Sequence, residues 1–239
     1  MTADALTVNL VLSAAAIAFV HTALGPDHTL PFVMLARARK WSLRRTLAIT
    51  AACGLGHVLS SIVLGGLGGA LGASTNALEG LETSRGAIAA WGMVVFGGVY
   101  ALWGLRQALK RKHGLALHAH AGHVHLHRYG AHGHGDGVGH EHDAPRTTTF
   151  WTLFVIFALG PCEPLIPLFF LPASEGRWSL ALVAATVFSL VTLATMLVLV
   201  GLAHAGVERL ELQRLERWAH ALAGGVIAGS GLAVLFLGL

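Results

Sequence analysis

The sequence predicts an all-α integral membrane protein with six transmembrane helices, arranged as a 3+3 inverted repeat with broken first and fourth helices. Three observations predict this fold class. Of the 239 residues, 54% are hydrophobic and 12% charged, with a mean hydropathy of +0.65. Apolar segments of about 20 residues, enough to cross a hydrocarbon core of ~30 Å, recur along the chain. A Gly-Pro motif inside one such segment returns in the second half.

The six predicted spans lie near residues 5–35, 46–72, 87–109, 147–173, 179–203 and 219–239. The chain therefore divides into a first repeat over residues 1–109, a His-rich loop over 110–146 and a second repeat over 147–239. No Lys or Arg precedes Arg37, so the amino end lacks the basic region of a signal peptide, and we assign it to the first span.

The distribution of Lys and Arg predicts the orientation, because basic residues gather in cytoplasmic loops. The connections after spans one, three and five are basic, whereas the alternate connections hold only Arg85 and Arg177. We therefore expect a multi-pass protein of the cytoplasmic membrane, with both termini outside and the His-rich loop in the cytoplasm. The net charge of +4 then reflects membrane topology and gives no indication of nucleic acid as a partner.

The repeat itself consists of two matched blocks. Ala23-Leu24-Gly25-Pro26 returns as Ala158-Leu159-Gly160-Pro161, and Trp41-Ser42-Leu43 returns as Trp178-Ser179-Leu180. Three spans per repeat is an odd number, so the second repeat enters the membrane in the opposite sense, as in many secondary transporters. Chance similarity between apolar segments is the alternative interpretation.

The prolines remove backbone donors at both breaks. Pro26 deprives the carbonyl of Thr22 of its helical partner, Pro161 does so for Phe157, and Pro164 for Gly160. Inside a membrane these carbonyls need a side chain, a water molecule or a cation as a new partner.

Side chains that bind transition metals stand beside both breaks. Imidazole suits Ni, Co, Cu and Zn, and carboxylate offsets the charge of a dication, whereas Mg or Ca sites use oxygen almost alone. The predicted metal ligands are His21, Asp27, His28, His57 and Glu163, with Cys162 as a further candidate.

Each ligand also has a structural interpretation. Asp27 and His28 could cap the half-helix that Pro26 starts, and His57 could be a hydrogen-bonded packing residue. Cys162 could be a small buried hydrophobe, as we expect for Cys53. His204 and His220 are expected at the membrane interface. The paired glycines Gly97-Gly98 and Gly224-Gly225 predict close helix packing.

The loop over residues 110–146 contains most of the 15 histidines, spaced as His-x-His pairs among Gly and Ala. Such a segment cannot bury a core and is expected to be disordered without metal. We interpret it as a cytoplasmic metal-capturing loop, the alternative being a solvated linker. Its predicted accessory ligands are His118, His120, His123, His125, His127, His132, His134, His140 and His142.

His21-Thr22-Ala23-Leu24-Gly25-Pro26-Asp27-His28 and Leu55-Gly56-His57 resemble the signature of the nickel/cobalt transporter family and the related NicO and UreH-like permeases. That signature has a His followed by Asp-His in one span and a Leu-Gly-His-Ser type motif in the next. The resemblance implies metal selection by His21, Asp27, His28 and His57. Here five residues separate His21 from Asp27, where the family has four, and Val58 replaces the Ser.

A second resemblance involves Gly160-Pro161-Cys162-Glu163-Pro164, which is similar to the Pro-Cys motif of DsbD-type and cytochrome c biogenesis thiol carriers. Those proteins pair one Cys from each half, and here the position that matches Cys162 is Asp27.

The sequence thus predicts a secondary permease for a divalent transition metal, with nickel or cobalt as transported substrate and zinc as an open alternative. No phosphate-binding loop and no His-Glu-x-x-His motif is present, so we expect neither an enzyme nor a tightly bound cofactor. The expected partners are the metal ion and membrane lipid. A homo-oligomer, a cytoplasmic metallochaperone and the direction of transport stay open.

Overall fold

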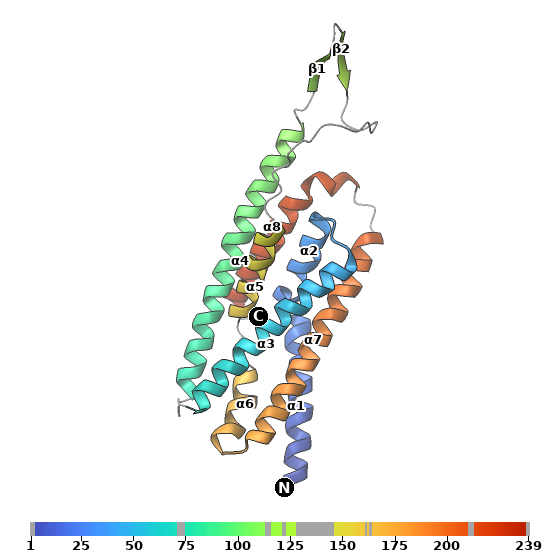
Figure 1. The fold of residues 1–239 in the computed structure, drawn as a ribbon. Helices are drawn as coiled ribbons and strands as arrows, with labels where there is room; N and C mark the ends of the chain where they lie inside the picture. Colours follow the sequence, from blue (N-terminus) through green and yellow to red (C-terminus); the bar gives the residue numbers. More distant parts are fainter. Residues whose placement is uncertain are drawn as a thin grey trace.

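The computed structural model describes residues 3–70, 75–112, 116–120, 123–127, 146–160, 162, 164–209 and 213–237. Long helices pack lengthwise into a bundle, and a short hairpin lies beyond the C-terminal end of α4 (Figure 1). In chain order the elements are α1 (Ala3–Leu24), η1 (Pro26–His28), α2 (Leu30–Ala38), α3 (Leu43–Ala70), α4 (Thr75–Lys112), β1 (Ala116–His120), β2 (His123–His127), α5 (Arg146–Leu159), α6 (Leu165–Ser174), α7 (Trp178–Arg209), η2 (Gln213–Trp218) and α8 (Ala219–Leu237).

Among the residues that the structure describes, five helices are long and apolar enough to cross a membrane. Their apolar stretches are Thr7–Leu24, Leu43–Gly68, Asn76–Leu109, Trp178–Val207 and Glu216–Leu237. Large side chains such as Val63, Val99 and Leu190 are about 60% exposed on the outside of the bundle, where lipid would cover them. These features confirm the predicted class, a helical multi-pass membrane protein. α5 and α6 are each shorter than one crossing, so the arrangement of six spans stays a prediction.

The first predicted break is present at the predicted residues. α1 ends at Leu24, directly before Gly25-Pro26, and α2 starts only at Leu30. A Cβ atom at Gly25 would collide with the side chains of Asp27 and His28, so only glycine leaves room for that pair. In the second half α5 ends at Leu159 and α6 begins at Leu165, while Pro161 and Glu163 lie outside the described residues.

Glycine brings α4 and α8 close together, as predicted. A Cβ at Gly97 would meet the backbone of Gly224 and Ala228, and a Cβ at Gly224 would meet the backbone of Gly97 and Ala101. The neighbouring Gly98 faces open space. The close approach therefore depends on one residue of each glycine pair.

Two large clusters of buried side chains fill the described part of the bundle, beside a small one formed by Leu78 and Phe170. In one, Phe32 of α2 packs on Phe157 of α5 with ring centroids 4.6 Å apart, and Cys53 is fully buried beside them, as expected for a packing residue. The other gathers around Phe188 of α7 and contains Cys162. Cys53 and Cys162 therefore lie in different clusters.

The His-rich loop differs from expectation, because part of it forms an antiparallel hairpin of β1 and β2. Its register pairs His118 with His125 and His120 with His123. Histidine alternates there with Leu117, Val124 and Leu126, and that period of two suits a strand. The all-α prediction thus holds for the bundle and not for this segment. His132, His134, His140 and His142 lie outside the described residues.

Candidate metal site

Three of the predicted histidines meet inside the bundle, although they come from three different elements. His21 stands in the last turn of α1, His28 in η1 and His57 midway along α3. The ring centroid of His28 lies 5.0 Å from that of His21 and 5.3 Å from that of His57. The break at Gly25-Pro26 makes this possible, because it turns η1 away from the path of α1.

Asp27 fixes the ring of His28. The Nδ1 atom of His28 lies 2.9 Å from Oδ1 of Asp27, and a carboxylate oxygen accepts, so Nδ1 carries the donated hydrogen. In the neutral ring the lone pair of His28 is then on Nε2. Carboxylates often orient metal-binding histidines in this way. The contact engages one oxygen of Asp27, and its predicted role as a direct metal ligand stays a prediction.

His57 is fixed by the second broken helix. Its Nδ1 donates to the carbonyl oxygen of Phe157 at 3.2 Å, and the backbone N–H of Gly160 donates to the same oxygen at 3.0 Å. This is the carbonyl that Pro161 was predicted to deprive of its helical partner. Because a carbonyl only accepts, the lone pair of His57 also lies on Nε2.

In each of the three imidazoles the same atom, Nε2, lacks a hydrogen-bond partner among the described residues. Nε2 of His21, His28 and His57 is buried in each case and has no hydrogen-bond partner in the described part of the chain. Buried polar atoms are nearly always paired, so three unpaired nitrogens in neighbouring rings need an explanation. A metal ion that accepts their lone pairs provides one.

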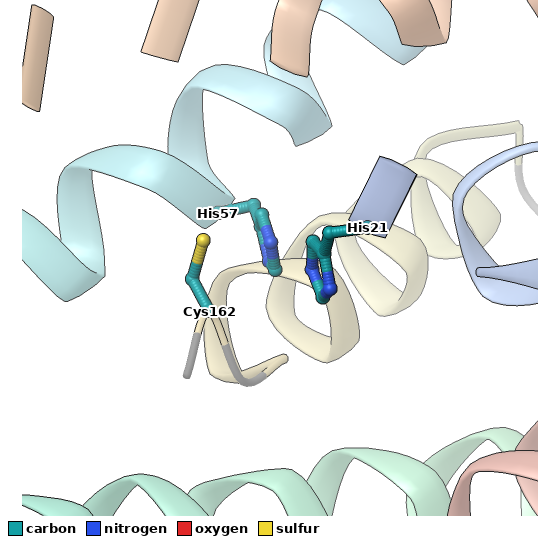
Figure 2. A group of neighbouring side chains, drawn as sticks. All are labelled: His21, His57 and Cys162. Atoms are coloured by element: carbon teal, nitrogen blue, oxygen red, sulfur yellow. The ribbon is translucent and has the colours of Figure 1, made fainter. Parts of the chain in front are cut away.

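Cys162 adds a sulfur to this cluster from the segment between α5 and α6. Ligand atoms of His21, His57 and Cys162 all lie within 4.8 Å of one another, and Figure 2 shows the three side chains side by side. Metal bonds of ~2.0–2.3 Å place the ligand atoms of one tetrahedral or trigonal ion about 3.4–3.8 Å apart, so the three atoms would have to move closer together to bind one ion. Beside Asp27 and His57 lies a void of about 10 Å³, room for one particle the size of a water molecule.

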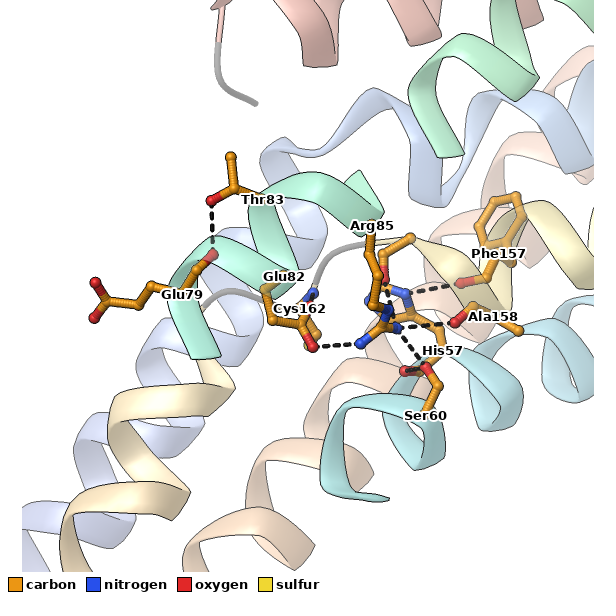
Figure 3. Close-up of polar contacts among 10 residues, drawn as sticks. His57, Ser60, Glu79, Glu82, Thr83, Arg85, Phe157, Ala158 and Cys162 are labelled. Atoms are coloured by element: carbon orange, nitrogen blue, oxygen red, sulfur yellow. Dashed lines mark hydrogen bonds and ion pairs between the residues drawn. The ribbon is translucent and has the colours of Figure 1, made fainter. Parts of the chain in front are cut away.

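An ion pair that the sequence interpretation missed supports this segment. α4 begins well before the predicted third span, and it carries Glu82, which is fully buried and ion-paired with Arg85. The other carboxylate oxygen of Glu82 accepts the backbone N–H of Cys162 at 3.3 Å (Figure 3). Glu82 and Arg85 carry opposite charges, are three positions apart and stand just before an apolar run. This pattern is the sequence signal that could have indicated the pair.

Arg85 then ties the broken helix to α3. Its guanidinium donates to the carbonyls of Ala158 at 3.0 Å and Gly160 at 3.4 Å, and to the Ser60 hydroxyl at 2.9 Å. Ser60 in turn donates to the carbonyl of His57 at 2.8 Å. Arg85 was predicted to lie in a loop, but it sits in α4 and supplies the partner that the Gly160 carbonyl lacks beside Pro164. We call Glu82, Arg85 and Ser60 the α4 clamp.

The remaining candidates are placed as follows. Glu163, predicted as a ligand from the second half, lies outside the described residues. His204 is buried, with Nε2 donating to the Trp41 carbonyl at 3.2 Å, and its expected place at the membrane interface stays a prediction. His220 is partly buried, and its Nδ1 lies 2.8 Å from the Tyr100 hydroxyl.

No protein-family model, curated protein or solved structure matches this chain. The resemblance of the first two spans to nickel/cobalt transporters therefore stays a prediction from the motif residues.

Proposed function

We propose that the protein is a secondary permease for divalent transition-metal ions, with Ni²⁺ or Co²⁺ as substrate. The observation that carries the proposal is the set of three buried imidazole Nε2 atoms without hydrogen-bond partners, next to the thiol of Cys162. Nothing else in the described part of the chain offers those nitrogens a partner, and a passing metal ion would.

The donor types select the class of ion. Imidazole nitrogen and sulfur favour first-row transition metals, whereas Mg²⁺ and Ca²⁺ require oxygen ligands. The carboxylate of Asp27, 2.9 Å from His28, contributes negative charge close to the rings and offsets part of the charge of a dication. Affinity follows the Irving–Williams order, so zinc stays open as a further substrate.

The position of the cluster suits transport. His21 and His28 flank the first break, and Cys162 lies in the second. In the proposed topology α5 and α6 together form a fourth crossing, giving six spans and a 3+3 inverted repeat. The ion would lose its water onto the histidines, Glu163 would shape the opposite gate, and rocking of one repeat against the other would alternate access.

The proposed orientation follows the positive-inside rule, with both termini outside and the His-rich hairpin in the cytoplasm. There the hairpin would capture metal or exchange it with a cytoplasmic metallochaperone.

The proposal is tested by metal flux in sealed proteoliposomes. Wild-type protein and His220→Ala, a histidine outside the cluster, should carry Ni²⁺ or Co²⁺. His57→Ala should lose that flux, and Asp27→Ala should reduce it. Unchanged flux in His57→Ala would overturn the site. Thiol–disulfide relay that depends on Cys162, without any metal flux, would instead favour a thiol carrier.

A further inference from the structure

A second, larger cavity lies at the end of α2 opposite the metal site. Its volume is about 860 Å³, and its walls come from the end of α2 and the turn after it, from α7 and from the η2–α8 junction. Its lining begins at Val33 in α2, five residues after His28, which is roughly 7.5 Å along the helix. We call it the basic cavity.

The charge of its lining is predominantly positive. Arg37, Lys40 and Arg217 line the basic cavity, together with His204 and His220. Among the described residues of the lining, Glu216 is the one carboxylate, and it is already paired with Lys40 at 2.9 Å. Such a lining repels a divalent cation and attracts an anion, so the basic cavity is not a second metal site.

Arg37 is available to a ligand. Its side chain is partly buried, and it forms no hydrogen bond or ion pair with any residue that the structure describes. A guanidinium presents its N–H donors as a planar fork, which fits the oxygens of a phosphate group.

The backbone conformation of Lys40 also suggests a role in binding a phosphate group. Its φ of +52° lies in the left-handed region, which favours glycine, at the end of α2 where the Trp41 N–H closes the helix onto the Ala36 carbonyl. A lysine at this position places a charge at the cavity mouth at some cost in backbone strain.

The basic cavity also lies where a membrane surface would be. Two ends of the apolar spanning stretches, Val207 and Glu216, line the cavity, and a third stretch begins at Leu43, directly after the lining residue Ser42. Val33, Trp41 and Val207 give it apolar walls behind the basic groups. Basic pockets between transmembrane helices at this depth bind the headgroups of anionic lipids.

We propose that the basic cavity binds a phosphate-bearing ligand, held by Arg37, Lys40 and Arg217. Two sources share this chemistry, namely the headgroup of an anionic phospholipid and a soluble phosphate compound. The inference is independent of metal transport, because no residue of the histidine cluster lines the cavity.

The test measures the thermal unfolding midpoint of the purified full-length protein in detergent. One titration adds phosphatidylglycerol in mixed micelles, with phosphatidylcholine as the neutral lipid, and another adds inorganic phosphate. We expect a saturable rise with phosphate-bearing anions and none with phosphatidylcholine. A rise with the anionic lipid alone identifies a headgroup site, and a rise with inorganic phosphate identifies a site for soluble compounds.

Variants connect the effect to the cavity. Arg37→Gln should require about tenfold more ligand, since a charge-assisted hydrogen bond is lost. Lys40→Gly should also weaken binding, and because glycine suits the left-handed backbone, this variant keeps the fold. The matched control is Arg44→Gln, an exposed residue of the same basic turn that does not line the cavity. The absence of any saturable rise, or an equal loss in Arg44→Gln, overturns the proposal.

Discussion

The Nδ1 atom of His57 donates a hydrogen bond to the carbonyl oxygen of Phe157, 3.2 Å away. His57 belongs to the first half of the chain, and Phe157 lies just before the break in the second half. The carbonyl that Pro161 leaves without its ordinary helical partner therefore sets the tautomer of a candidate metal ligand in the other half. A movement of the second break would therefore change the orientation of His57. The geometry of the candidate site thus depends on the conformation of the second half.

The different roles of Asp27 and His28 give a first prediction. If Asp27 orients the ring and does not bind the ion, Asp27→Asn should weaken Ni²⁺ binding by about 10–100-fold, whereas His28→Ala should abolish it. Equilibrium binding of Ni²⁺ to detergent-purified protein measures both. Glu175→Gln, at an exposed carboxylate, should bind normally. Equal losses in Asp27→Asn and His28→Ala would make Asp27 a direct ligand.

Cys162 and Cys53 provide a matched pair for the sulfur ligand, because both are buried and neither forms a disulfide. A thiolate bound to Co²⁺ gives a ligand-to-metal charge-transfer absorption. This band should appear when the wild type binds Co²⁺, persist in Cys53→Ser and disappear in Cys162→Ser. Persistence of the band in Cys162→Ser would remove sulfur from the site.

The histidines and the first break could be predicted from the sequence because their signals are local. A Gly-Pro inside an apolar segment interrupts a helix wherever that segment lies, and ionisable residues beside it stand out against their neighbours. The hydrogen bond between Asp27 and His28 could not be predicted, because the local backbone of the break decides whether two adjacent side chains meet.

The α4 clamp could not be predicted for a different reason. Glu82 and Arg85 look like solvated residues outside a span, and only the packing of α4 against both halves brings them to Gly160 and Cys162. The Gly, Ala and His content of residues 110–146 predicts a loop. The alternation of histidine with other residues over 116–120 and 123–127 instead suits the strands of the hairpin.

Removal of Arg85 should destabilise the protein strongly. Arg85→Gln leaves the fully buried carboxylate of Glu82 without its cation, at a cost of about 3 kcal/mol or more. Arg177→Gln breaks an exposed ion pair with Glu175, in which the charged atoms are 3.9 Å apart, and should lower the free energy of unfolding by less than ~1 kcal/mol. Thermal unfolding in detergent compares the two variants. Equal midpoints would show that the α4 clamp contributes little to the fold.

Two adjacent glycines test the α4–α8 contact. Gly97→Ala forces a methyl group against the backbone of α8 and should destabilise the protein by about 1–3 kcal/mol. Gly98→Ala adds the same methyl group to open space and should be neutral or stabilising by up to ~1 kcal/mol, because alanine favours a helix. Thermal unfolding again reports the difference. A loss in Gly98→Ala as large as in Gly97→Ala would mean that the close approach is not what requires glycine.

Deletion of residues 113–143 separates the His-rich loop from the transport site. The candidate metal ligands that the structure describes come from α1, η1, α3 and the segment after α5, all within the bundle, so the maximal flux should survive. Flux at low metal concentration should fall, because the histidines that capture the ion at the membrane surface are gone. The measurement is Ni²⁺ flux in proteoliposomes over a range of concentrations. The control replaces the loop by a Gly/Ser linker of equal length, which keeps the spacing between α4 and α5 and removes the histidines. Both variants should show the same rise in the half-saturating concentration. Complete loss of flux in the linker variant would show that the loop histidines belong to the transport path itself.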